Sequence, residues 1–256
     1  MKKFLVICAA MVICSCAIFN GSRQVPDDIP SYNYWVTLPK SGELVVLGVA
    51  GRQSSRDAEI RIATEDAARK IAMYNGVWAS VRSVQSIGSG YLDYFLETET
   101  VLEYNQQFDQ FKDKLKFDPD RDITRNNDGA IFIRFTYPLN FPGNINYKSG
   151  KNPDGSPDWT TKQAQQIGTF ITGVGMSGRQ DRFGDTVRKS YEAAAASIVT
   201  NYSAYMNSSN TSIGSATELY ISQVSEGLLK NFLVLEVWID PKTRAVYTLA
   251  IASQID

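Results

Sequence analysis

The feature that most constrains the fold of this chain is a glycine-rich stretch that occurs twice. Residues 171–180 read Ile-Thr-Gly-Val-Gly-Met-Ser-Gly-Arg-Gln, and residues 47–53 read Leu-Gly-Val-Ala-Gly-Arg-Gln. In both places a short apolar run precedes the glycines and an alanine-rich stretch of helical spacing follows, which predicts a strand, a tight turn and a helix. Because the copies lie about one domain length apart, we expect a duplication into two domains of about 100 residues each.

The first copy contains signals for each element of a small domain. Residues 44–49 have the length of a strand, and Ser54 or Ser55 can cap a helix that ends at Asn-Gly near Tyr74. A strand is expected next at residues 77–87. A hairpin turn at Asn-Asn-Asp-Gly and an alternating strand end the copy. Between them, apolar residues spaced by three and four predict a second helix: Val101, Tyr104, Phe108, Phe111 and Leu115.

Two side-chain groups in this copy have simple structural interpretations. On the first helix, Glu65 with Arg69 and Asp66 with Lys70 are spaced as i,i+4 pairs, which predicts ion pairs on a solvated face. The aromatic residues that open the folded part are expected to cover the first core, with a sugar-binding or membrane-interface cluster as the alternative: Tyr32, Tyr34 and Trp35.

The second copy is predicted to repeat the order of the first, which is strand, helix, strand, helix and hairpin. Its helix is expected from a stripe of apolar residues at helical spacing, and a shorter helix is expected near residues 216–226. Residues 233–239 and 245–252 alternate as strands around a turn at 240–243. The stripe consists of Phe183, Val187, Tyr191, Ala194, Ile198, Tyr202 and Tyr205.

These patterns predict an α/β (α+β) fold of two similar domains, each a small, mostly antiparallel sheet packed by two helices. The proline- and glycine-rich segment between the copies reads as a linker. The expected boundaries are a signal peptide at 1–15, a tether at 16–31, a first domain at 32–137, a linker at 138–157 and a second domain at 158–256.

The N-terminus predicts the compartment. Lys2 and Lys3 precede an apolar run of about ten residues, which is an export signal and is too short to span a membrane. The sequence Ile-Cys-Ser-Cys ending at Cys16 resembles the lipobox of bacterial lipoproteins, which implies cleavage before Cys16 and acylation, palmitate included, of the new terminus. An uncleaved anchor or an ordinary secretory peptide is the alternative. No aspartate follows Cys16, which resembles the pattern of outer-membrane lipoproteins facing the periplasm.

The composition excludes several kinds of chemistry. The chain has no histidine, which removes the commonest general base and metal ligand, and a net charge of -1 argues against nucleic acid as a partner. After cleavage the one remaining cysteine is Cys16, so neither a disulfide nor a thiol nucleophile is expected. We predict no enzymatic activity, no cofactor and no metal. The expected partners are the membrane, through the lipid, and either another protein or a second copy of the chain.

The glycine-rich loops leave two questions open. Residues 173–178 match the dinucleotide fingerprint G-x-G-x-x-G, but no acidic residue ends a second strand about twenty positions on, and a tight strand-to-helix turn explains the same glycines. Arg52-Gln53 and Arg179-Gln180 recur in the two loops. They are candidates to contact an anionic ligand or a partner, or alternatively to hold the helix entry beside neighbouring carboxylates.

The chain also resembles the LPP20 family of bacterial lipoproteins. The residues that carry the resemblance are Trp35 and Trp159 at the start of each copy, the glycines at the strand ends, the alanine spacing of the first helix and the closing hairpin near Trp238 and Tyr247. The resemblance implies a compact α/β domain in the cell envelope and a structural or assembly role, in an envelope-spanning or flagellum-associated complex. The alternative is a periplasmic module that binds peptidoglycan fragments or another small anionic ligand.

Overall fold

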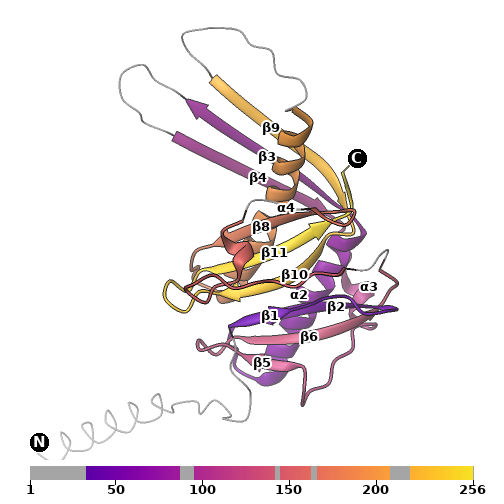
Figure 1. The fold of residues 1–256 in the computed structure, drawn as a ribbon. Coiled ribbons are helices and arrows are strands. Elements are labelled where there is room, and N and C mark those ends of the chain that lie inside the picture. Colours follow the sequence, from indigo (N-terminus) through magenta and orange to yellow (C-terminus); the bar gives the residue numbers. More distant parts are fainter. Residues whose placement is uncertain (1–32, 87–94, 142–144, 163–165, 208–219, 256) are drawn as a thin grey trace, which may run out of the picture. The chain divides into compact units, whose positions relative to one another are not determined.

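Two long helices and three antiparallel sheets make up most of the fold in the computed structural model (Figure 1). The structure describes residues 33–86, 95–141, 145–162, 166–207 and 220–255. The helices are α2 (Arg56–Asn75), the short α3 (Asp109–Lys112), α4 (Phe183–Asn207) and the 3-10 turn η1 (Asp158–Thr160). The fold is therefore α+β with mostly antiparallel sheets.

The strands form three sheets, which we name A, B and C. Sheet A has the order β2-β6-β5, sheet B the order β1-β10-β11-β8-β7, and sheet C the order β12-β9-β3-β4. The strand bounds are β1 (Tyr34–Val36), β2 (Glu43–Ala50), β3 (Val77–Ser86), β4 (Phe95–Tyr104), β5 (Ile123–Arg125), β6 (Ile131–Pro138), β7 (Gln166–Ile167), β8 (Phe170–Ser177), β9 (Tyr220–Lys230), β10 (Leu233–Ile239), β11 (Val246–Ala252) and β12 (Gln254–Ile255).

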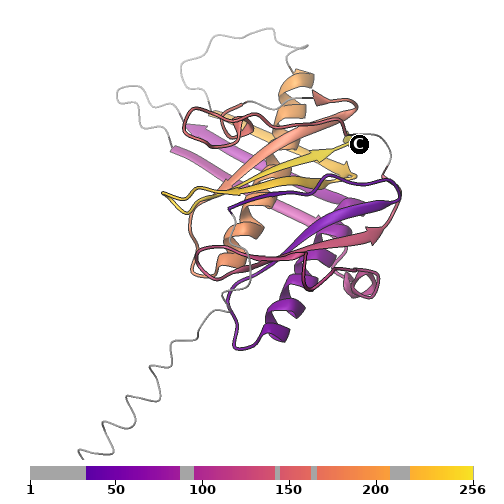
Figure 2. The ribbon, with the colours of Figure 1, turned by 60° about the horizontal axis from the view of Figure 1, so that its bottom comes forward.

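Each long helix packs on the strand that precedes it. Helix α2 lies on β2 of sheet A, and α4 lies on β8 and β11 of sheet B and also contacts β9 and β3 of sheet C. Figure 2 shows the strands of sheets A and B in front of the two helices. The strand, turn and helix expected from each glycine-rich stretch are therefore confirmed.

The local signals at the first helix are confirmed as well. The Ser55 hydroxyl accepts a hydrogen bond from the backbone N–H of Ala58, and the helix ends at Gly76, whose backbone has a φ of 156° that favours glycine. The Asn-Asn-Asp-Gly sequence forms the turn between β5 and β6, where the Asn126 side chain accepts from the backbone of Asp128 and Ala130. Glycine at position 129, with a φ of 79°, completes this turn.

The two halves of the chain share one core and two sheets. Strand β1 of the first half pairs with β10 of the second, and β3 pairs with β9 along ten residues of each strand. Trp35 stacks on Phe132 and belongs to the same buried cluster as Tyr191 and Ile198 of α4. The residues Ser31–Asp256 cluster as one compact unit. The expectation of two separate domains is therefore not confirmed, because apolar faces of both halves are buried against each other.

The second helix expected in the first copy is wrong. Residues 95–104 form strand β4, and only the four residues of α3 are helical in the stretch where a longer helix was expected. Val101 is 43% exposed whereas Tyr104 packs against the core, so these two residues lie on opposite faces of a strand. The three-and-four spacing predicts a helix, whereas residues 95–104 also fit the two-residue period of a strand. Pairing with β3 decides in favour of the strand.

One expectation for the second half also needs correction. Residues 220–226, expected to be helical, belong to strand β9, and the rest of that expected helix lies outside the described residues. At the end of the expected linker Ser156 and Pro157 are buried, and Trp159, which follows it, is 3% exposed. Both segments pair or pack against strands that are distant in the sequence, which local patterns do not reveal.

The signal peptide, Cys16, the tether and Tyr32 lie outside the described residues. Among the helices that the structure describes, none combines the length and the apolar character needed to cross a membrane.

Candidate functional site

The two strand-to-helix turns are built by the same contacts at equivalent positions. The backbone N–H of Gln53 donates to Glu59 Oε1 at 3.2 Å, and that of Gln180 donates to Thr186 Oγ1 at 3.0 Å. Each glutamine side chain also donates to the carbonyl of the glycine two residues earlier, at 3.1 Å and 3.2 Å. Both glutamines thus shape the helix entry.

The glycines before each turn allow the helix to lie directly on its strand. A Cβ atom at Gly48 would lie 2.1 Å from the backbone oxygen of Ala63, and one at Gly175 would lie 2.0 Å from that of Ser190. A Cβ atom at Gly173 would lie 2.3 Å from the oxygen of Ala194. Gly173 and Gly175 are inside strand β8 and face α4, whereas the dinucleotide fingerprint places glycines in the turn. Close packing explains them.

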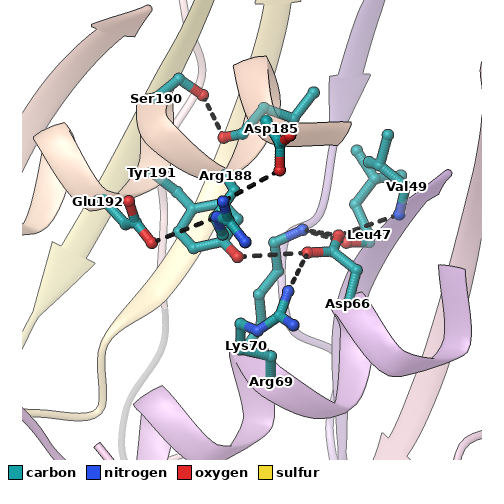
Figure 3. A network of polar contacts seen from close by, with 11 residues as sticks. Leu47, Val49, Asp66, Arg69, Lys70, Asp185, Arg188, Ser190, Tyr191 and Glu192 are labelled. Atoms are coloured by element: carbon teal, nitrogen blue, oxygen red, sulfur yellow. Dashed lines mark hydrogen bonds and ion pairs between the residues drawn. The ribbon is translucent and has the colours of Figure 1, made fainter. Parts of the chain in front are cut away.

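Below the first turn, a buried ion pair joins α2 to the edge of sheet A (Figure 3). The Lys70 ammonium donates to Asp66 Oδ2 at 2.5 Å and to the carbonyl oxygen of Leu47 at 2.7 Å, and the N–H of Val49 donates to Asp66 Oδ2 at 3.0 Å. Because β2 is an edge strand, these backbone groups have no strand partner on that side, and the two side chains satisfy them.

The same pair reaches α4 through Tyr191. The Tyr191 hydroxyl donates to Asp66 Oδ1 at 3.3 Å, and the Lys70 ammonium lies 4.8 Å from the centre of the Tyr191 ring. Burial lowers the pKa of Lys70, and the nearby Asp66 opposes this shift. Burial also raises the pKa of Tyr191 well above its usual value, with the Asp66 charge adding to it. The cluster therefore holds the two halves together as a satisfied polar network.

This network corrects one expectation from the sequence. Asp66 and Lys70 do form an i,i+4 pair, but they are 8% and 5% exposed and lie in the interior, not on a solvated face. Glu65 pairs with Arg61 at 3.1 Å and with Lys112 at 3.4 Å, and Arg69 turns to Asp66 at 3.7 Å. The helix is covered on this side by the second half of the chain, which its own amphipathic pattern does not show.

A cavity of about 620 Å³ lies beside this network, between α2 and the start of α4, and includes Asp66 and Arg69 in its lining. The first turn contributes Arg52 and Gln53, and the residues just after the second turn, 181–185, contribute to the opposite wall. Charged groups of both signs line it: Arg52, Arg69, Arg182, Arg188, Glu65, Asp66, Asp128, Asp181 and Asp185.

Two arginines of the cavity wall, Arg69 and Arg188, are positioned by carboxylates. Arg188 lies 3.0 Å from Asp185 and 3.7 Å from Glu192, as Figure 3 shows. Burial raises the pKa of Glu192, and Arg188 opposes the shift. This lining can present both positive and negative groups to a small ligand.

The structure separates the two Arg-Gln pairs predicted from the sequence. Arg52 and Gln53 line the cavity, whereas Arg179 and Gln180 are not part of its wall. Arg179 is exposed, and Gln180 accepts a hydrogen bond from Lys189 at 2.9 Å. Among the described residues, no group of three or more acidic or cysteine side chains is arranged to hold a metal ion.

Another buried acid, which sequence reasoning missed, lies in strand β10 on the face of sheet B that points away from α4. Glu236 is 2% exposed and accepts hydrogen bonds from the Tyr34 hydroxyl at 2.5 Å and from the Trp159 ring N–H. Burial raises the pKa of Glu236, while these hydrogen bonds oppose the shift, and burial together with Glu236 raises the pKa of Tyr34 to about 12. This acid fixes residues 145–162 to the sheet. The one sequence signal that could have indicated a buried acid here is the position of Glu236 between apolar residues of β10.

Comparison with known proteins adds no relative to this description. No protein-family model matches the chain, and no match was found among curated proteins or solved structures, so the resemblance to the LPP20 family stays a prediction.

Proposed function

We propose that this protein is held in the outer membrane by a lipid on Cys16, faces the periplasm, and acts without catalysis as a structural or assembly component. The observation that carries the proposal is the lipobox-like sequence ending at Cys16 after an export signal. The described interior supports a scaffold role, because two pairs of buried charges form ion pairs within the fold. These pairs are Asp66 with Lys70 and Glu59 with Arg125.

The anchor is tested by replacing Cys16 with serine. The wild-type protein should incorporate labelled palmitate and sediment with membranes, and Cys16→Ser should do neither. Cys8→Ser, in the apolar run of the signal, is the matched control and should behave as wild type. Unchanged fractionation and labelling of Cys16→Ser would refute the anchor.

The assembly role is tested separately in intact cells. Crosslinking should give discrete adducts with another envelope protein, as in an envelope-spanning or flagellum-associated complex, or with a second copy of this chain. A protein that crosslinks to nothing, while still anchored, would refute the assembly role and leave the anchor standing.

A second proposal concerns the origin of the fold: the two halves are duplicated LPP20-like units that have become interlocked. Its support is that the same contacts recur in both halves. The contact of Gln53 with Glu59 corresponds to that of Gln180 with Thr186, and the close approach at Gly48 corresponds to that at Gly175. Equivalent residues are separated by the same number of positions in each case. Residues 32–137 and 158–256 expressed as separate chains should be insoluble alone and soluble together. Independent folding of either half would show that the shared core is dispensable.

The cavity favours a second candidate function, a binding module for a peptidoglycan fragment or another small anionic ligand. Its specific support is the position of Arg52 in the wall, beside residues 181–185 of the other half. A muropeptide, which carries carboxylates and amines on one short peptide, matches a lining of both signs. Arg52→Ala should weaken retention on purified cell wall, while Arg179→Ala, outside the wall, should not. Equal retention of both variants and wild type would refute cavity binding.

A further inference from the structure

The outer face of sheet B carries a row of large side chains that crosses four strands. Tyr34 of β1 is in register with Trp238 of β10, Trp238 with Tyr247 of β11, and Tyr247 with Met176 of β8. Side chains alternate between the two faces of a strand, and the neighbours Val237, Thr248 and Gly175 face α4. The four residues of the row therefore share the face that points away from α4.

The described residues cover only part of this face. Residues 145–162 cover the Tyr34 end of the row: the Trp159 ring N–H donates to Glu236, and Ser149 Oγ lies 2.6 Å from the Tyr34 hydroxyl. The row lies toward the end of the sheet, where Tyr34, Trp238 and Tyr247 are half-buried and Met176 is 56% exposed. The Trp238 and Tyr247 rings lie 5.3 Å apart at 44°. The row therefore combines half-buried rings with the exposed Met176 side chain, and the tilt of the two rings means that it is not a flat platform.

The chemistry of the row suits the boundary between lipid and water. Tryptophan and tyrosine concentrate at membrane interfaces because an apolar ring and a polar group meet the two sides of that boundary. Two exposed cations, Arg179 and Lys242, follow the ends of β8 and β10 at the same end of the sheet. Lipid phosphates attract cations placed beside an apolar surface.

The position of the row in the chain selects the membrane as its occupant. Tyr34, at one end of the row, follows the proposed tether of residues 16–31 after two residues. A chain of about 16 residues spans at most about 55 Å when extended, so the lipid on Cys16 keeps the folded part close to the bilayer. At the resulting millimolar effective concentration, a small apolar patch is sufficient for docking.

We propose that the row Tyr34–Trp238–Tyr247–Met176 docks on the phospholipid surface to which the tether anchors the protein. This inference rests on the proposed lipid anchor. It orients the fold with the open end of sheet B toward the membrane and assigns Arg179 to the headgroup region.

The test uses the lipidated full-length mature protein in vesicles of phosphatidylethanolamine and phosphatidylglycerol. Apart from the lipid-blocked Cys16, the mature chain has no cysteine, so Met176→Cys can be labelled selectively with an environment-sensitive fluorophore. Asn75→Cys, exposed at the end of α2, is the matched control. Lipids with nitroxide-bearing acyl chains should quench the label at position 176 several-fold more than the control label, and adding Tyr247→Ser should reduce that difference.

Three outcomes overturn the docking. Equal quenching at both positions, with the protein still floating with the vesicles, refutes it and leaves the anchor intact. Quenching at position 176 that falls toward the control value when purified cell wall is added would assign the row to glycan. Failure of the wild-type protein to float with vesicles refutes the proposed anchor itself and, with it, this orientation.

Discussion

Replacing Asp66 by asparagine tests whether the buried network holds the two halves of the fold together. The change keeps the size of the side chain and removes the charge that compensates Lys70, which is 5% exposed. Lys70 would keep one acceptor, the Leu47 carbonyl, and the new amide N–H groups would face the donors of Val49 and Tyr191. Removing one partner of a buried ion pair costs about 3–5 kcal/mol, so we expect Asp66→Asn to lower the free energy of unfolding by that amount.

The reverse change should cost less. In Lys70→Met the Asp66 carboxylate stays near Arg69, 3.7 Å away, and keeps the hydrogen bonds from Val49 and Tyr191. The double variant Asp66→Asn with Lys70→Met should therefore cost less than the sum of the single changes, because it removes both members of the most buried pair together. Urea unfolding followed by tryptophan fluorescence measures all three free energies, since Trp35 and Trp159 are buried.

The Arg61–Glu65 pair on the same helix is the matched control. Arg61 is 65% exposed, and exposed pairs contribute about 0.2–1 kcal/mol, so Arg61→Met should change the free energy of unfolding by no more than that. If Asp66→Asn proved as mild as Arg61→Met, the reasoning from burial would be refuted.

Three further predictions concern packing, titration and capping. Gly175→Ala should destabilise the fold by about 1–3 kcal/mol or more, because its Cβ would lie 2.0 Å from a backbone oxygen of α4. Gly178→Ala, with nothing within 4 Å, should be nearly neutral in the same urea experiment, and equal costs would contradict the packing argument. The pKa of Glu236 is raised above 4.5 by burial, so the folded state binds more protons, and wild-type stability should fall relative to Glu236→Gln as pH rises from 4.5 through the folded pKa. A stability difference that stays flat or rises over that window would show that burial does not govern this acid. Ser55→Ala should cost about 1 kcal/mol and Ser54→Ala much less, since Ser55 caps α2; thermal melts showing the opposite order would assign the cap to Ser54.

Much of the local structure could be predicted because it depends on neighbours in the sequence. Each of these local features depends on contacts between residues only a few positions apart. They are the apolar run of β2, the Ser55 cap, the glycine after Asn75 and the turn after Arg125. The candidate site was predicted only in part. Arg52 and Gln53 were identified from their recurrence, but the cavity wall also needs residues 181–185, which reach it only because the two halves pack together.

What the sequence by itself determined was the repeated strand, turn and helix and the α+β class. The tertiary structure alone decided that the two copies share a core, that residues 95–104 pair as a strand, and that Asp66 and Lys70 are interior. The physical reason is that burial depends on which surfaces meet across long sequence separations. The apolar periodicity of α2 predicts only the face that packs on its own sheet. A different face of this helix is covered by the second half of the chain, which the periodicity does not predict.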